Sequence, residues 1–136
     1  MTYAFKSDGV SVMKKSLLLA FGLALAMAST SAMAAGDASK GKKIFKKCKA
    51  CHSLKPGKKK IGPSLFGVVG RKSGSAKGFK YSKGMKKLDI VWDEKSLSEF
   101  LTAPRKYVKG TRMTFRGLKK EADRKNVIAY LKEVAK

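Results

Sequence analysis

The sequence predicts a small all-α domain in which three main helices are joined by long loops. Apolar residues recur with helical spacing in three stretches, and no stretch shows the alternating pattern of a half-buried strand. Glycine- and proline-rich stretches separate the expected helices. The chain has 136 residues, of which 43% are hydrophobic, and this size and composition suit a single core rather than two domains.

The first 34 residues are typical of a cleaved secretory signal peptide with a short N-terminal extension. Lys14 and Lys15 precede an apolar run at 17–28, and small residues then lead to Ala32-Met33-Ala34, an A-x-A cleavage pattern. The run is 12 residues long, whereas a membrane-spanning helix needs about 20. We therefore expect cleavage near Ala34, export to an oxidising compartment, and one domain at residues 35–136.

The composition is strongly basic. The 32 Lys and Arg residues against 9 Asp and Glu give a formal charge of +23, and the predicted domain keeps +21 because residues 1–34 contain three Lys and one Asp. Seven Phe, four Tyr and one Trp supply a core, so the charge does not indicate disorder. The charge alone suggests a nucleic-acid binder. The domain lacks a continuous basic helix or a base-reading motif, and we expect no specific nucleic acid.

The first helix is expected from about Asp37 to the cysteines that follow it. Asp37 can cap the helix, and Ile44 and Phe45 form an apolar side within a Lys-rich stretch. An exposed turn is expected at 55–57, and an ordered loop at 64–81, where glycines are too frequent for a stable helix.

Two more helices are expected in the second half of the domain. One begins at Trp92-Asp93-Glu94 with Asp93 as N-cap, buries an apolar face and ends at Pro104. The other runs from about Lys120 to Val134, and its apolar face packs on the first helix. The residues of these faces are Leu97, Phe100 and Leu101 in one helix, and Val127, Ile128, Leu131 and Val134, with Tyr130 alongside, in the other.

The segment Cys48-Lys49-Ala50-Cys51-His52 uses both cysteines and the only histidine of the chain. C-x-x-C-H is the motif of covalent c-type haem attachment. Two thiols on one helical turn can each bond a vinyl group of the same porphyrin, and the adjacent His then lies beneath the iron. The other chemistries of these residues fit less well, because a structural zinc site needs four ligands and a thioredoxin-like pair needs a βαβ context. A simple disulfide stays open as an alternative.

The second axial ligand of such a haem has few candidates. The predicted domain has no other His, and Met85 and Met113 are its only thioethers. Met113 lies in a loop after Pro104 that is long enough to reach the far face of the haem. Met85 lies in a Lys-rich stretch interpreted as a surface helix, where a packing or exposed Met is expected.

Further motifs run in order through residues 36–136. They are Gly62-Pro63-Ser64-Leu65, Gly70-Arg71-Lys72-Ser73-Gly74, Gly78-Phe79-Lys80-Tyr81-Ser82, Trp92, Pro104-Arg105-Lys106-Tyr107, the loop around Met113, and Val127-Ile128-Ala129-Tyr130-Leu131. Together with the haem motif they resemble class I cytochrome c, of the small soluble, mitochondrial-like type found in bacteria. The resemblance implies the class I cytochrome c fold, with three main helices and long loops wrapped around one covalently bound haem c, and a periplasmic location.

The resemblance also implies roles for individual residues. Cys48 and Cys51 would form the thioethers, His52 and Met113 would bind the iron, and the Pro63 carbonyl would accept the outer proton of His52. Residues at positions that hydrogen-bond or neutralise the haem propionates are Arg71, Tyr81, Ser82 and Trp92, with the Thr111 hydroxyl near the inner propionate.

The chain departs from the family pattern at three positions near the haem. Phe100 stands where the family usually has a Tyr whose hydroxyl bonds near the Met sulfur, Met85 stands for an Asn, and Lys109 for a Pro. We hypothesise that Lys106 or Lys109 replaces Met113 on the iron at alkaline pH, because each is close to the loop and becomes a ligand on deprotonation.

A haem iron with both axial positions filled has no site for substrate, so the sequence predicts an electron-transfer protein and not an enzyme. The expected function is single-electron transfer between a quinol-oxidising bc-type complex or a dehydrogenase and a terminal acceptor such as an oxidase. Transient, salt-sensitive docking on acidic faces of membrane redox complexes and a monomeric state are expected from the charge. A haem peroxidase or a gas-binding sensor is the alternative if Met113 is not a stable ligand.

Overall fold

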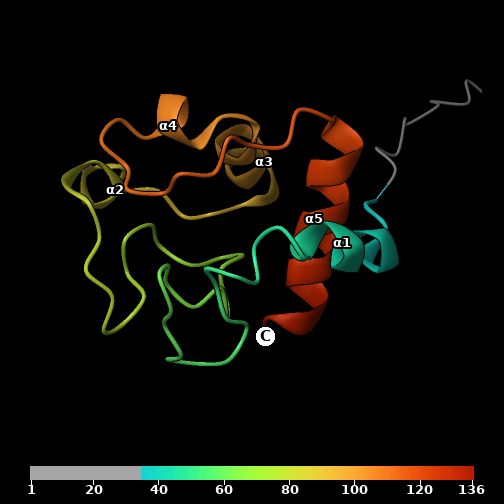
Figure 1. Ribbon diagram of the computed structural model, residues 1–136, viewed down its shortest axis with the longest axis horizontal. Coiled ribbons are helices and arrows are strands. Elements are labelled where there is room, and N and C mark those ends of the chain that lie inside the picture. Colours follow the sequence, from blue (N-terminus) through green and yellow to red (C-terminus); the bar gives the residue numbers. More distant parts are fainter. Residues whose placement is uncertain (1–34) are drawn as a thin grey trace, which may run out of the picture. The chain divides into compact units, whose positions relative to one another are not determined.

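The computed structural model describes residues 35–136, so the predicted signal peptide lies outside the described residues. The described part is helical, as expected, with long irregular connections and a single isolated β-bridge between Lys72 and Val91 (Figure 1). The helices are α1 (Ala38–Phe45), α2 (Lys83–Lys87), α3 (Glu94–Thr102), α4 (Pro104–Tyr107) and α5 (Glu121–Val134). Among the helices of residues 35–136, none combines the length and apolar content of a membrane span.

Helices α1 and α5 cross in direct contact, which confirms the predicted packing of the last helix on the first (Figure 1). Gly41 makes the close approach possible, because a Cβ atom there would overlap the Asn126 carbonyl and lie 2.7 Å from the Tyr130 Cβ. The rings of Phe45 and Tyr130 pack with their centroids 5.5 Å apart. The amide of Asp37 donates to the Asn126 side chain at 2.8 Å, so the start of α1 is also fixed to α5.

Helix α3 begins and buries its face as the sequence predicts. The Asp93 side chain accepts from the Ser96 amide at 2.7 Å, and the Ser96 hydroxyl accepts from the Asp93 amide at 3.0 Å, which completes a capping box. Arg124 of α5 donates from its Nε to the Ser98 hydroxyl at 3.0 Å and so connects α5 to α3.

The core is formed by the predicted faces together with residues from the loops. Its buried apolar members are Phe45, Val68, Trp92, Leu97, Phe100, Leu101, Val108, Leu118, Val127, Ile128, Leu131 and Ala135. The prediction that Val134 belongs to the buried face is wrong, because this residue is 37% exposed at the end of α5. Ala135 takes the buried position there instead.

The segment after Pro104 also differs from the expected loop. Pro104 follows the end of α3, as predicted, and then occupies the first turn of α4, where its missing N–H costs no hydrogen bond. The Lys-rich stretch with Met85 forms the short α2 that was expected, and the Ser82 hydroxyl caps it by accepting from the Met85 amide at 3.2 Å.

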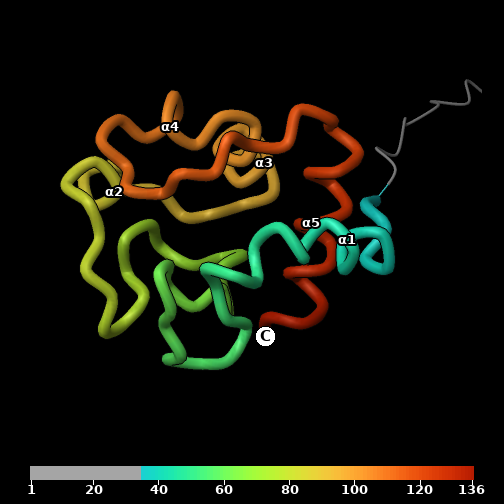
Figure 2. The backbone as a smooth tube through the Cα atoms, in the orientation of Figure 1, coloured from blue at the N-terminus to red at the C-terminus, as the bar shows by residue number. Residues whose placement is uncertain are grey.

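Two long irregular segments complete the domain, one between α1 and α2 and the other between α4 and α5 (Figure 2). The first is fixed by backbone bonds to distant residues, as an ordered loop requires. The Gly70 amide donates to the Trp92 carbonyl at 2.7 Å, the Ser73 amide donates to the Ile90 carbonyl at 2.7 Å, and the Gly67 amide donates to the Ala135 carbonyl. The order predicted for residues 64–81 is therefore confirmed.

Candidate haem site

The C-x-x-C-H motif lies on turns that continue from the end of α1. The Cys48 amide donates to the Phe45 carbonyl at 2.8 Å, and the amides of Cys51 and His52 donate to the Cys48 carbonyl at 3.1 and 2.9 Å. Both cysteines are half-buried free thiols. These turns place the two sulfurs one turn apart on the chain, the spacing that two bonds to one porphyrin need.

The environment of Cys48 does not resemble that of a redox-active thiol. Burial, and after it the nearby Cys51, raises the pKa of the Cys48 thiol above its ordinary value. Disulfide oxidoreductases instead lower the pKa of the attacking cysteine, because the thiolate is the nucleophile. The site therefore suits two thiols that are consumed in bonds to a cofactor better than a thioredoxin-like pair.

His52 is oriented by a single backbone acceptor. Its Nδ1 lies 2.8 Å from the Pro63 carbonyl oxygen. Because a carbonyl can only accept, Nδ1 carries the proton and Nε2 keeps a lone pair for a metal ion. Burial lowers the pKa of His52, the hydrogen bond to Pro63 opposes that change, and Lys60 adds to it. The imidazole is therefore held in the neutral form that a metal ligand requires.

The ring of His52 packs directly on Gly62. A Cβ atom at Gly62 would overlap the ring, with 2.8 Å to Nδ1 and 2.9 Å to Nε2. The Gly62 amide donates to the Cys51 carbonyl at 2.8 Å, so the glycine and the haem motif are connected through the backbone as well. Only a residue without a side chain fits at this position.

The loop that carries Pro63 is fixed at several further points. The Leu65 amide donates to the Ser53 carbonyl at 2.8 Å, and the Ser64 hydroxyl donates to the Lys55 carbonyl at 2.6 Å. The Lys60 ammonium donates to the Lys49 carbonyl at 2.5 Å. These contacts position the Pro63 carbonyl relative to the haem motif.

Arg71 has one buried donor nitrogen without a hydrogen-bond partner among the described residues. Its Nη1 donates to the Phe66 carbonyl at 2.5 Å and its Nη2 to the Ser64 carbonyl at 2.9 Å, while its Nε is buried and has no partner within residues 35–136. Burial lowers the pKa of Arg71, and the proximity of Tyr81 opposes that change. A buried guanidinium N–H without an acceptor is costly, and a carboxylate such as a haem propionate would satisfy it.

The other predicted propionate residues lie in the same part of the fold. The Trp92 amide donates to the Arg71 carbonyl at 2.9 Å, and Trp92 itself is 6% exposed. Burial raises the pKa of Tyr81, and Arg71 lowers it in part, so the two side chains are electrostatic neighbours. The Ser82 hydroxyl accepts from the Met85 amide and keeps its own proton for another acceptor.

Met113 lies half-buried against the core in the segment between α4 and α5. Its amide donates to the Thr111 hydroxyl at 3.3 Å, so the structure shows Thr111 supporting the turn before Met113. The guanidinium of Arg112 donates to the Lys80 carbonyl across the fold. Met85 is also half-buried against the core, which agrees with its interpretation as a packing residue.

Phe100 is buried within an aromatic cluster. Its ring centroid lies 5.1 Å from that of Trp92 and 6.0 Å from that of Tyr107. Phe100 has no hydroxyl, so its side chain contributes packing and no hydrogen bond to this site.

Three residues with clear positions at the site were not singled out from the sequence for these roles. Gly62 supports the His52 ring, Lys60 bonds the haem motif, and Arg112 connects the Met113 segment to Lys80. The chain has 13 Gly and 32 Lys and Arg residues, so their type carries little information. The one usable signal was that Gly62 directly precedes Pro63, whose carbonyl accepts from His52.

Comparison with known proteins shows the family to which this chain is similar. Residues 38–135 match the family model described as cytochrome c. The chain is 53% identical over 100 residues to "Cytochrome c2" of Rhodoblastus acidophilus, which covers 73% of this chain and 94% of that protein. It is 47% identical over 118 residues to "Cytochrome c-554" of Methylosinus trichosporium, covering 86% and 89%.

A solved structure shares the fold. Cytochrome cH from Methylobacterium extorquens superposes with a TM-score of 0.69 at 43% identity, and the match covers 72% of this chain and 99% of that one.

Proposed function

The chain belongs to the cytochrome c family, whose members are electron-transfer proteins with one covalent haem c, and we propose that it is a diffusible periplasmic carrier of single electrons. The proposed donor is a quinol-oxidising bc-type complex or a dehydrogenase, and the proposed acceptor is a terminal complex such as an oxidase. Haem c supplies an iron that takes up and releases one electron between Fe3+ and Fe2+. Export rests on the predicted signal peptide in residues 1–34.

The observation that carries this proposal is the bond between His52 and Pro63. It fixes the His52 tautomer with Nε2 unprotonated, directly after two thiols one turn apart. We assign the thioether bonds to Cys48 and Cys51 and the first axial bond to His52. The Pro63 carbonyl also makes the imidazole a stronger donor, because it accepts the proton on the opposite nitrogen.

The second axial bond is assigned to Met113. It is one of two thioethers in the described residues, and its segment is shaped by Thr111 and connected across the fold by Arg112. A thioether ligand raises the reduction potential relative to a second nitrogen ligand. A haem iron held by both His52 and Met113 would have no free position for a substrate.

The propionates are assigned to the part of the fold that holds Arg71, Tyr81, Ser82 and Trp92. The buried Nε of Arg71 supports this, because it needs an acidic acceptor. The Tyr81 and Ser82 hydroxyls and the Trp92 indole N–H are further donors. Thr111 is assigned a double role, since its oxygen accepts from the Met113 amide and its proton remains for the inner propionate.

The basic surface is proposed to steer the carrier to acidic faces of its redox partners. Seven cations near the haem motif or the Met113 segment are exposed, and they are Lys46, Lys47, Lys49, Lys55, Lys106, Lys109 and Arg112. Association rates with such partners fall as ionic strength rises. The same repulsion between like surfaces supports a monomer.

A spectrum of the haem-loaded protein with two matched variants tests the ligand assignment. We expect the oxidised protein and Met85→Leu to show the far-red sulfur-to-iron charge-transfer band, and Met113→Leu to lose it. Reduced Met113→Leu is expected to bind carbon monoxide at neutral pH, whereas the other two proteins exclude it. A band that survives in Met113→Leu contradicts the assignment. Carbon monoxide binding by the unmodified protein would favour a peroxidase or gas sensor.

A further inference from the structure

Lys60 connects the basic loop after the C-x-x-C-H motif back to the motif itself. Its ammonium donates to the Lys49 carbonyl at 2.5 Å, across 11 residues of sequence. Lys49 lies between Cys48 and Cys51, the two cysteines assigned to the thioether bonds. Within residues 35–136, no other side chain donates a hydrogen bond to the backbone of residues 48–52. The contact is therefore specific to one lysine of this very basic chain.

The bond from Lys60 completes the backbone bonding of the turn that carries the cysteines. The Cys48 carbonyl accepts from the amides of Cys51 and His52. The Lys49 carbonyl accepts from no backbone amide in the part of the chain that the structure describes. A carbonyl beyond the end of a helix needs a partner from elsewhere, and the Lys60 ammonium is that partner.

The Lys60 side chain also starts from a fixed point. The Lys60 amide donates to the Gly62 carbonyl at 3.0 Å, and the Gly62 amide donates to the Cys51 carbonyl at 2.8 Å. Gly62 in turn packs on the ring of His52. A lysine usually carries its charge on a flexible four-carbon stem. Here the backbone and the ammonium are both connected to the motif, so the charge has a defined place.

No carboxylate neutralises the charge of Lys60 among the described residues. None of the ion pairs within residues 35–136 involves this lysine. The sequence has no Asp or Glu between Asp37 and Asp89. Burial lowers the pKa of His52, the hydrogen bond to Pro63 opposes that change, and the charge of Lys60 adds to it. The field of the ammonium thus reaches the proposed iron ligand.

We propose that Lys60 is a positioning residue whose fixed charge raises the reduction potential of the haem. This inference rests on the proposed function, because it needs a haem held by Cys48, Cys51 and His52. Reduction of Fe3+ to Fe2+ takes one electron from a redox partner and removes one positive charge at the iron. A cation held beside His52 opposes the higher charge of Fe3+ and so favours the reduced form. Its bond to Lys49 keeps the ammonium at that place.

Redox titration of the haem-loaded protein and two Lys60 variants tests the proposal. Lys60→Gln removes the charge, and we expect the equilibrium constant for reduction to fall about threefold, or ~30 mV at ~59 mV per tenfold for one electron. Lys60→Arg keeps the charge and a donor, so its constant should stay within about 1.5-fold of the unmodified value. A contact that only held the turn would change the free energy of unfolding and leave the constant unchanged. An unchanged constant in Lys60→Gln overturns the proposal.

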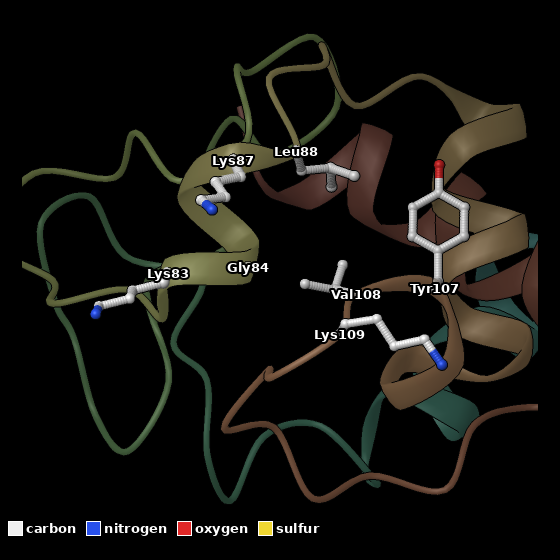
Figure 3. Close-up of a pocket in the computed structure, with 7 residues that line it drawn as sticks. All are labelled: Lys83, Gly84, Lys87, Leu88, Tyr107, Val108 and Lys109. Atoms are coloured by element: carbon white, nitrogen blue, oxygen red, sulfur yellow. The ribbon is translucent and has the colours of Figure 1, made fainter.

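Two further lysines separate a local charge from the general basicity of the surface. Lys58 lies in the same loop, and Lys87 lies on α2 beside the hollow between that helix and the residues after α4 (Figure 3). Both are exposed, and neither takes part in an ion pair within residues 35–136. Lys58→Gln and Lys87→Gln each remove one charge and should change the constant less than about 1.5-fold, because salt screens exposed charges. A change as large as that of Lys60→Gln in either control overturns the proposal.

Spectra recorded during the titration distinguish this inference from the proposed function. An unmodified protein that attaches no haem would overturn the proposed function and this inference with it. If every variant has the spectrum of the unmodified protein but the constants do not follow the charge of residue 60, the inference alone is overturned. Constants that fall in Lys60→Gln and recover in Lys60→Arg support both.

Discussion

The two sides of the proposed haem site differ in how firmly the backbone holds them. On the His52 side, Lys60, Gly62 and Pro63 bond directly to the haem motif. The bonds of Ser64 and Leu65 to Lys55 and Ser53 hold the same loop together internally. On the Met113 side, no backbone-to-backbone bond involves residues 112–117 in the part of the chain that the structure describes. Within residues 35–136, the hydrogen bonds of that segment come from the Thr111 hydroxyl and the Arg112 guanidinium, while Met113 and Phe115 pack against the core.

From this difference we expect one of the two proposed iron ligands to be exchanged before the other. Releasing His52 requires breaking a bonded loop, whereas Met113 can leave when one short segment moves. The bonded loop 53–65 holds His52 in position. Changes in pH or solvent should therefore act first on residues 112–117, which carry Met113.

The largest effect is expected from Gly62→Ala, which places a methyl group inside the His52 ring. We expect a loss of about 2 to 3 kcal/mol in the free energy of unfolding, because the ring or the loop must shift in a packed site. Gly57→Ala is the matched control in the same loop. Gly57 has φ of +63° and open space around it, so its variant should lose only about 1 kcal/mol from backbone strain. Guanidinium unfolding of the haem-loaded proteins measures the free energy of unfolding of both variants. Equal losses in the two variants would contradict a special role of Gly62.

An intermediate effect is expected from the lysines next to the looser segment. Lys106 and Lys109 are both exposed, and Lys109 lies three residues before Arg112, where that segment begins. At alkaline pH we expect one of them to replace Met113, so Lys106→Ala or Lys109→Ala should raise the pH at which the far-red band disappears. The band is followed in a pH titration of the oxidised protein. Disappearance at an unchanged pH in both variants would rule out these lysines as the incoming ligand.

The smallest effect is expected from Asp93→Asn at the start of α3. Hydrogen bonds from the Ser96 amide and hydroxyl lower the pKa of Asp93 below its ordinary value of 3.8. The carboxylate therefore contributes stability above that pH, and the contribution is lost as the pH falls through the lower folded-state value. We expect the melting temperatures of the unmodified protein and the variant to differ slightly at pH 7 and to converge below pH 3.8. If the difference in melting temperature stays constant with pH, the substitution acts through side-chain shape and not through the charge of the carboxylate.

Helices were more predictable from the sequence than the site around them. The caps at Asp37 and Asp93 and the spacing of Leu97, Phe100 and Leu101 are local signals, and the structure confirms each of them. Helix α4 was missed because a four-residue helix that begins with proline has no periodicity to detect. Val134 was misplaced because the helix ends there, and burial at a helix end depends on what packs over it.

The chemistry of this protein follows from a short local motif. The spacing of Cys48, Cys51 and His52 allows one covalent haem because the bonds that build a helical turn are local. The tertiary structure alone decided how that chemistry is held. Pro63 meets His52 across 11 residues, Arg112 meets Lys80 across 32, and Arg71 is buried with its Nε unpaired. These contacts form where irregular loops fold back on each other, and loops carry no periodic pattern from which their path can be predicted.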